Sequence, residues 1–186
     1  MPAPSVEPSG PGNHIGSVEN ARGTVDNLVF INKVAGNLGQ GLLVQADGTG
    51  YGALSGLQFY NNTVDNVTQE ALILTNTPAA QVVNNVFYDG GGGGDNYLFA
   101  DSSSNNFTAA ANDFYMSNGA RTGSYGSNAP SSNWNPAFMS PTTGNFQLSI
   151  SSPLIDAGET LLVVPHDYYG IARPAGGNDL GAFEYH

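Results

Sequence analysis

The chain of 186 residues contains no cysteine, which excludes disulfide bonds and metal sites built on thiolates. No apolar run approaches the roughly 20 residues that a membrane-spanning helix needs. Charged residues make up only 10% of the chain, and four basic residues face 15 acidic ones, for a net charge of −11. Because phosphates are neutralised by a basic surface, we expect neither nucleic acid nor a membrane as a partner. A neutral ligand would not be repelled by the negative charge of the chain.

The small polar residues Gly, Asn, Ser and Thr fill much of the space that charged residues leave. This composition does not suit a helical bundle, which needs charged outer faces, and it favours an all-β fold with many turns. Residues 1–12, MPAPSVEPSGPG, predict a linker or a frayed N-terminus. Such a linker is typical of one module within a longer secreted protein, so we expect an extracellular location.

A short apolar strand followed by Asn recurs about every 20 to 30 residues. A second set of apolar strands alternates with the first, so each repeat holds at least two strands. The first set is LVFINKVA from Leu28, LQFYNNTV from Leu57, AQVVNNVF from Ala80 and TAAANDFY from Thr108, with Asn32, Asn61, Asn84 and Asn112 aligned. The second set is GQGLLVQADG from Gly39, TQEALILTNT from Thr68 and GDNYLFADSS from Gly94.

This period predicts a right-handed parallel β-helix, a single-stranded solenoid in which each repeat is one coil. Asn tolerates left-handed backbone angles, so it suits the corner between two sheets, and stacked Asn side chains can bond from coil to coil. The alternative fold is an antiparallel sandwich. The alignment predicts an interior column, an outward column and two further apolar columns. These are Phe30, Phe59, Val82 and Ala110; Ile31, Tyr60, Val83 and Ala111; Leu43, Leu72 and Leu98; and Val44, Ile73 and Phe99.

The last third of the chain carries a dense series of short motifs. These are Asn-x-x-Pro-x-Phe at 133–138, Phe-x-Leu at 146–148, SPLIDAG at 152–158, Asp167, Gly170 and Arg173 in Asp-x-x-Gly-x-x-Arg, and DLGAFEY at 179–185. Together they resemble the C-terminal capping region of secreted bacterial right-handed β-helix proteins. The resemblance implies coils over 13–132 and a capping segment over 133–186 of the same domain. It implies no single activity, because that family includes lyases, glycosidases and non-catalytic binders.

We expect the capping segment to be structural and to cover the strands that are apolar on both faces. In this interpretation Arg173 pairs with Asp167, Asp179 or Glu184, and Trp134 is packed inside the segment.

Enzymatic motifs are sparse. A β-helix polysaccharide lyase needs a basic residue to abstract a proton, and Lys33 is the only lysine. The motifs of polygalacturonase-type glycosidases are absent, although a pair among Asp65, Glu70, Asp95 and Asp101 could serve hydrolysis. No cofactor is expected, with one alternative: Asp89 and Asp95, which flank a run of glycines, could bind Ca²⁺.

Nine tyrosines in an amide-rich chain with few charged residues favour binding of a neutral sugar polymer, since sugars stack on aromatic rings and bond to amides and carboxylates. The predicted binding residues are Tyr51, Tyr60, Tyr88, Tyr97, Tyr115, Tyr125, Asp47, Gln58, Glu70 and Asp95. In size, linker, acidity and lack of catalytic motifs the chain is similar to β-helical carbohydrate-binding modules of plant-polysaccharide hydrolases such as xylanases.

The sequence therefore predicts a non-catalytic module that binds a neutral plant cell-wall polysaccharide, with xylan as the expected polymer, beside a tethered catalytic domain. A polysaccharide lyase or glycoside hydrolase, and a structural or adhesive end of a surface protein, are the alternative functions.

Overall fold

A computed structural model of the chain is built almost entirely from β-strands, and the residues that it describes contain no α-helix. Both observations agree with the all-β prediction, and no described helix could cross a membrane. The structure describes residues 13–15, 24–26, 29–31, 42–45 and 98–100 as strand backbone, and residues 55–65, 72–89, 106–116 and 132–186 with their side chains.

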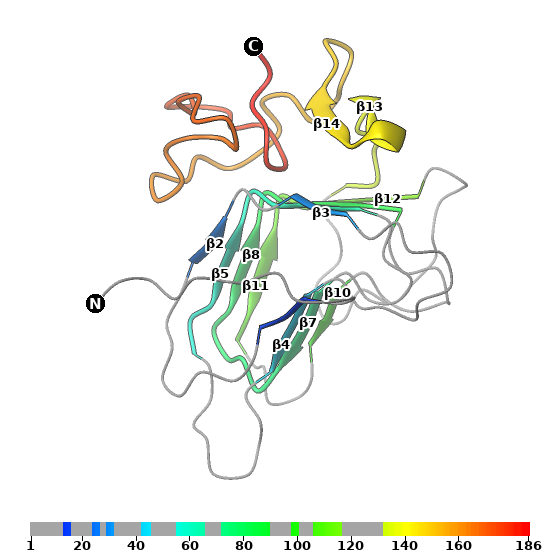
Figure 1. Cartoon of the computed structure of the whole chain (residues 1–186). Coiled ribbons are helices and arrows are strands. Elements are labelled where there is room, and N and C mark those ends of the chain that lie inside the picture. The colour runs from blue at the N-terminus through cyan, green and yellow to red at the C-terminus, as the bar shows by residue number, and fades with distance from the viewer. Residues whose placement is uncertain are drawn as a thin grey trace.

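Twelve strands form three parallel sheets of four strands each (Figure 1). Each sheet takes every third strand of the chain, so three consecutive strands make one three-strand unit. The first sheet contains β1 (Asn13–Ile15), β4 (Leu42–Gln45), β7 (Leu72–Thr75) and β10 (Leu98–Ala100). The second contains β2 (Thr24–Asp26), β5 (Gln58–Tyr60), β8 (Gln81–Val83) and β11 (Thr108–Ala110). The third contains β3 (Val29–Ile31), β6 (Thr63–Asp65), β9 (Val86–Tyr88) and β12 (Asp113–Tyr115).

All strand pairs in these sheets are parallel, whereas an antiparallel sandwich would pair them in opposite directions. Side chains with little or no exposure fill the space between the sheets. The rings of Phe59 and Phe87 stack with their centroids 6.4 Å apart, and Phe87 stacks on Phe114 at 4.8 Å. The parallel register of β9 and β12 thus places Phe87 over Phe114, while the contact of Phe59 with Phe87 joins the second sheet to the third.

Two residues separate each strand of the second sheet from the next strand in the third sheet. The first of the two has a left-handed backbone in Asn61, Asn84 and Ala111, with φ of 51°, 61° and 47°. The prediction of an Asn corner is confirmed for Asn61 and Asn84. Asn112 also lies in a corner, but its predicted alignment is wrong, because it follows the left-handed residue and aligns with Asn62 and Asn85. Asn32 lies outside the described residues.

The second corner residue carries a ladder of buried amides. The Asn62 side chain donates to Asn85 Oδ1 at 3.0 Å, and the Asn85 side chain donates to Asn112 Oδ1 at 2.9 Å. The same oxygens accept the backbone N–H groups of Asn62 and Asn85. Asn85 and Asn112 also donate to the carbonyls of Phe59 and Val82. Each side chain therefore joins adjacent units while satisfying polar groups that are removed from water.

Several predicted columns are displaced from the observed register. Phe30 pairs with Val64 in the third sheet and not with Phe59. The alignment treated β3 as the strand before a corner, whereas in the structure β3 is the strand after one. Val82 pairs with Ala109, and Ala110 pairs with Val83. In the first sheet Leu43 pairs with Ile73, one residue away from the prediction. The pairs Leu72–Leu98 and Ile73–Phe99 are as predicted.

The C-terminal segment, residues 132–186, begins with Ser132 beside β12 and continues through an antiparallel pair. That pair is β13 (Phe138–Ser140) and β14 (Asn145–Leu148), with a short 3-10 turn at Pro141–Thr143 between them. The rest of the segment is irregular, and it packs on the outer faces of the second and third sheets. Val164 contacts Tyr60 and Val83 in one cluster, and Leu148, Leu154 and Leu180 surround Val86 in another.

The C-terminal segment was expected to cover the strands that are apolar on both faces, and this prediction of its position is wrong. β7 is buried on both faces as predicted, with Leu72, Ile73 and Leu74 all shielded. However, the first sheet lies on the side of the parallel strands away from the C-terminal segment (Figure 1). The segment instead docks on the Asn corner, where Asn61 donates to the Asp179 carbonyl at 3.1 Å and Asn84 to the Glu159 carbonyl at 2.7 Å.

Candidate functional site

Tyr60 was expected to present an exposed ring, and the structure contradicts that expectation. The residue points out of the second sheet but is only 3% exposed, because Val164 and Leu161 of the C-terminal segment cover it. Its hydroxyl donates to the side chain of Gln81. A ring enclosed in this way offers no face to a sugar.

Tyr88 and Tyr115 were predicted to bind a ligand together, and the structure does bring them together. Their rings stack with centroids 5.9 Å apart, and the Tyr88 ring also meets the edge of Phe138 at 5.3 Å. Both residues are half-buried, and Tyr88 packs against the cluster of Val86 and Leu148. Because the facing sides of the two rings are used on each other, this pair contributes chiefly to the junction between β13 and the third sheet.

The remaining predicted residues are scattered. Gln58 is half-buried at the start of β5. Asp89 directly follows β9 in a left-handed conformation, and its N–H donates to the Tyr115 carbonyl at 2.8 Å. No group of three or more His, Cys, Asp or Glu suited to a metal occurs among the residues that the structure describes. The other predicted residues lie outside the described residues: Asp47, Tyr51, Glu70, Asp95, Tyr97 and Tyr125, and with them Lys33 and Asp101.

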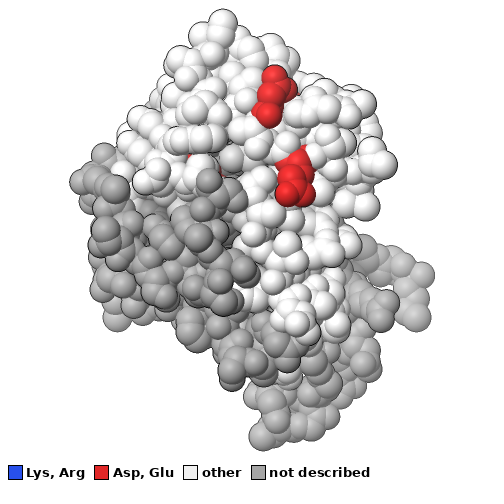
Figure 2. All heavy atoms as spheres, turned by 180° about the vertical axis from the view of Figure 1, so that it is seen from behind, with Lys and Arg blue, Asp and Glu red and all other residues white. Residues whose placement is uncertain are grey.

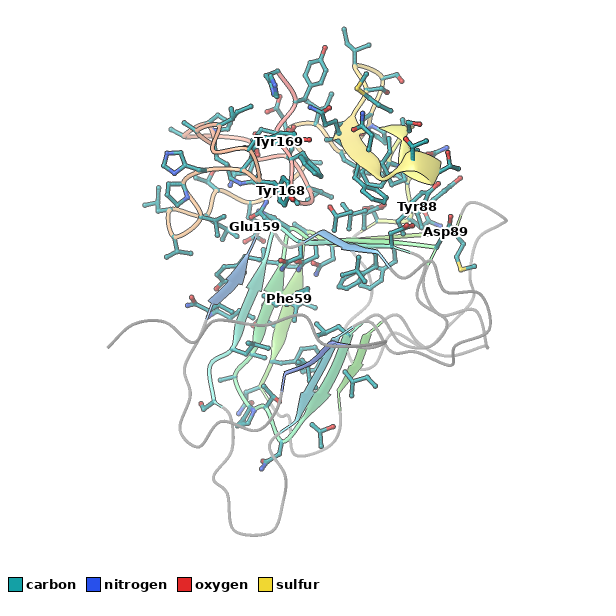
Figure 3. The ribbon with its side chains drawn as sticks, viewed as in Figure 1. Phe59, Tyr88, Asp89, Glu159, Tyr168 and Tyr169 are labelled. Carbon is teal, nitrogen blue, oxygen red and sulfur yellow. The ribbon has the colours of Figure 1, made fainter. Side chains whose placement is uncertain are left out.

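The most prominent exposed aromatic group is one that the sequence analysis did not select. Tyr168 and Tyr169 are 53% and 59% exposed, and both rings pack on Phe183, with centroids 5.2 and 5.3 Å from it. We call these two rings the tyrosine surface. Both belong to the C-terminal segment, above the parallel sheets in the view of Figure 3. Neither hydroxyl bonds to another described residue.

The backbone of the tyrosine surface is held in a turn. Gly170 donates its N–H to the Asp167 carbonyl at 3.0 Å, which places Tyr168 and Tyr169 at the two central, protruding positions. The buried Asp167 carboxylate accepts the N–H groups of Tyr169 and Ile171 through Oδ1. Tyr168 donates its N–H to the Ala182 carbonyl at 2.8 Å. These bonds fix both tyrosines before any ligand arrives.

A buried charge cluster supports this turn from below. Arg173 forms an ion pair with Glu184 and donates to the Gly181 carbonyl at 3.1 Å. Of the three predicted partners of Arg173, Glu184 is the one that forms an ion pair with it. Burial raises the pKa of the Glu184 carboxyl and lowers that of the Arg173 guanidinium, and their mutual attraction opposes both shifts. Asp167 Oδ2 accepts the Glu184 N–H and so links the turn to the cluster.

With histidine counted as neutral, the exposed charges of the C-terminal segment are acidic. Asp156 and Glu159 are exposed, whereas Arg173, the one Lys or Arg with a described side chain, is buried in its ion pair. Figure 2 shows isolated acidic groups and no basic group among the described atoms of the face that it presents. Figure 3 places Glu159 below Tyr168. The Glu159 backbone is held by Asn84, whose Oδ1 accepts the Glu159 N–H at 2.8 Å.

Asp113 has the electrostatic character of a general acid but not the accessibility. Burial raises its pKa to about 6, against the lowering effect of hydrogen bonds from Ser132 and Trp134. Oδ1 accepts both bonds, at 2.6 and 2.8 Å, while Oδ2 has no partner among the described residues. The residue is 0% exposed beneath the segment that it anchors, so a substrate cannot reach it in this conformation.

Trp134 was predicted to be packed and is instead 47% exposed. Its backbone is fixed by Asp113, but its ring extends from the start of the C-terminal segment between the exposed residues Asn133 and Asn135.

A sequence signal for the tyrosine surface did exist. Asp at the first position and Gly at the fourth favour a turn, and the turn's central residues, here Tyr168 and Tyr169, then face solvent.

Comparison with known proteins gives no family assignment. No protein-family model matches the chain, and a search of curated proteins finds no match.

Proposed function

We propose that the twelve parallel strands form a right-handed β-helix closed on one flank by the C-terminal segment. Each sheet takes one strand from each of four successive three-strand units, and the Asn62–Asn85–Asn112 ladder runs along one corner of them. Parallel crossovers are right-handed in nearly all proteins, which favours that hand here. This arrangement would supply a rigid scaffold, on which the C-terminal segment presents the tyrosine surface.

The proposed function of this scaffold is non-catalytic binding of a neutral polysaccharide. The observation that carries the proposal is the pair of exposed rings, Tyr168 and Tyr169, held on a preformed turn. The C–H faces of a sugar stack on aromatic rings, while the two hydroxyls donate to and accept from sugar hydroxyls. Since the turn is ordered by Asp167 in the absence of ligand, little conformational entropy is lost when a sugar binds.

A neutral polymer fits the charges better than an acidic one. The exposed described carboxylates would repel a uronate chain, and no exposed described cation would offset that repulsion. Among neutral polymers we propose plant cell-wall xylan, bound outside the cell by a module tethered to a catalytic domain. One such site binds weakly on its own, and tethering raises the effective concentration of the enzyme at its substrate.

Affinity electrophoresis of the purified chain through xylan, β-glucan, pectin and alginate tests the proposal. We expect retardation by a neutral polymer, without product release, and little retardation by pectin or alginate. Tyr168→Ala should reduce the retardation, whereas Tyr185→Ala should not. Tyr185 is also exposed and belongs to the same segment, but it makes no ring contact with another described residue.

Cleavage of a polymer by the purified chain would overturn the proposal in favour of a lyase or hydrolase. Migration unaffected by every polymer would favour a structural or adhesive role.

A further inference from the structure

The rings of the tyrosine surface are strongly inclined to one another. Tyr168 and Tyr169 have centroids 5.4 Å apart and planes at 74°, and the Phe183 plane is inclined to theirs by 57° and 49°. No two of these rings are close to coplanar. The surface is therefore a corner made of one ring face and a neighbouring ring edge, and not a flat strip.

This shape restricts the form of polysaccharide that can bind. A crystalline polysaccharide presents many chains in one plane, and it can be stacked on only by rings that share a plane. At a corner, one sugar stacks on the first ring while the second ring lies beside that sugar. The next sugar of the chain can follow the corner only if it rotates relative to the first. Rotation of that kind occurs in a single hydrated chain and is blocked in a crystal.

The corner resists flattening. Phe183 is buried and contacts both rings, so a shift of either tyrosine into a common plane would break ring contacts worth about 0.5–1.5 kcal/mol each. The backbone cannot compensate easily, because Tyr168 is bonded to Ala182 and Tyr169 to Asp167.

We infer that the tyrosine surface recognises one or two sugar units of a single, non-crystalline neutral chain and excludes the flat faces of crystalline polysaccharide. This inference rests on the proposed function and narrows its ligand class.

The test compares ligands that are built from the same sugars but differ in crystallinity. Calorimetry with xylohexaose and cellohexaose, and depletion assays with amorphous cellulose, measure binding to disordered chains. Depletion assays with crystalline xylan hydrate and microcrystalline cellulose measure binding to flat faces. We expect at least about tenfold tighter binding to the disordered form of whichever polymer is recognised. Tyr169→Ala should reduce that binding by about tenfold or more, and Tyr169→Phe, which keeps the ring, by about threefold or less.

The possible failures are distinguishable. Equal or tighter binding to the crystalline form, lost in Tyr169→Ala, would overturn this inference and leave the proposed function in place. Binding that is unchanged in Tyr168→Ala and Tyr169→Ala would place the ligand elsewhere and overturn the inference as well. No binding to any of these ligands would overturn the proposed function itself. Circular dichroism of each variant establishes that it is folded.

Discussion

The side-chain oxygen of Asn85 accepts two hydrogen bonds from Asn62, one from its backbone N–H at 2.9 Å and one from its side-chain amide at 3.0 Å. Asn85 in turn donates to Phe59 and Asn112, so one buried side chain bonds to groups of the two units on either side of its own. This arrangement makes the Asn corner a stabilising element as well as a turn.

Replacing Asn85 should destabilise the chain far more than an average surface change. Asn85→Ala removes partners from several buried polar groups, each of which costs about 1–3 kcal/mol when left unsatisfied, so we expect a loss of at least about 3 kcal/mol. Urea unfolding followed by circular dichroism measures it. The control Asn133→Ala alters an exposed amide and should stay within about 0.5 kcal/mol. Equal effects in the two variants would mean that the ladder adds nothing.

The junction between the C-terminal segment and the parallel strands depends on a glycine. Gly181 has φ of +88°, and a Cβ there would lie 2.8 Å from Thr63 Oγ1 and 3.0 Å from Val86 Cγ2. Gly181→Ala should therefore cost about 2–4 kcal/mol, from backbone strain together with overpacking. Gly56 also has a positive φ, of +73°, but open space around it, so Gly56→Ala should cost only about 1–2 kcal/mol. Thermal unfolding of both variants separates strain from contact, and a smaller loss in Gly181→Ala than in Gly56→Ala would contradict the packing argument.

Much of the local structure could be predicted from the sequence, and most errors were errors of register. Apolar stretches bounded by Asn and Gly located β3 to β5, β7, β8, β10 and β11 and two of the corners, but they included neither β1 nor β2. Asn112 was misaligned because Ala111 takes the left-handed position that Asn occupies elsewhere. Phe30 was misassigned because strands on either side of a two-residue corner have the same apolar character, so the pattern does not show which sheet a strand joins.

The candidate site was harder to predict because it depends on contacts between distant parts of the chain. Strand alternation indicates that Tyr60 points outward, but it cannot show that Val164, about a hundred residues later, covers it. Tyr168 and Tyr169 were overlooked for the converse reason: they belong to a segment whose motifs were interpreted as structural.

Tyr60 now supports a prediction opposite to that of the sequence. Tyr60→Ala opens a cavity beneath Val164 and Leu161, and it should reduce the free energy of unfolding by about 3–5 kcal/mol. Tyr60→Phe loses only the bond to Gln81 and should cost about 1 kcal/mol. Neither variant, where folded, should change retardation by a polysaccharide. Wild-type stability combined with lost retardation in Tyr60→Ala would restore Tyr60 to the binding site.

Asp113 should make the stability of the chain depend on pH. Its pKa is raised by burial to about 6 in the folded state, above the value of about 3.9 expected when the chain is unfolded. Its contribution to stability is therefore fully present below about pH 4 and is lost as the pH rises through about 6, by at most about 3 kcal/mol. Asp113→Asn has no charge to bury, so the stability of the variant relative to the wild type should increase between pH 4 and pH 7. Urea midpoints across this range measure the difference. A constant difference between Asp113→Asn and the wild type at all pH values would show that Asp113 does not titrate in the folded chain.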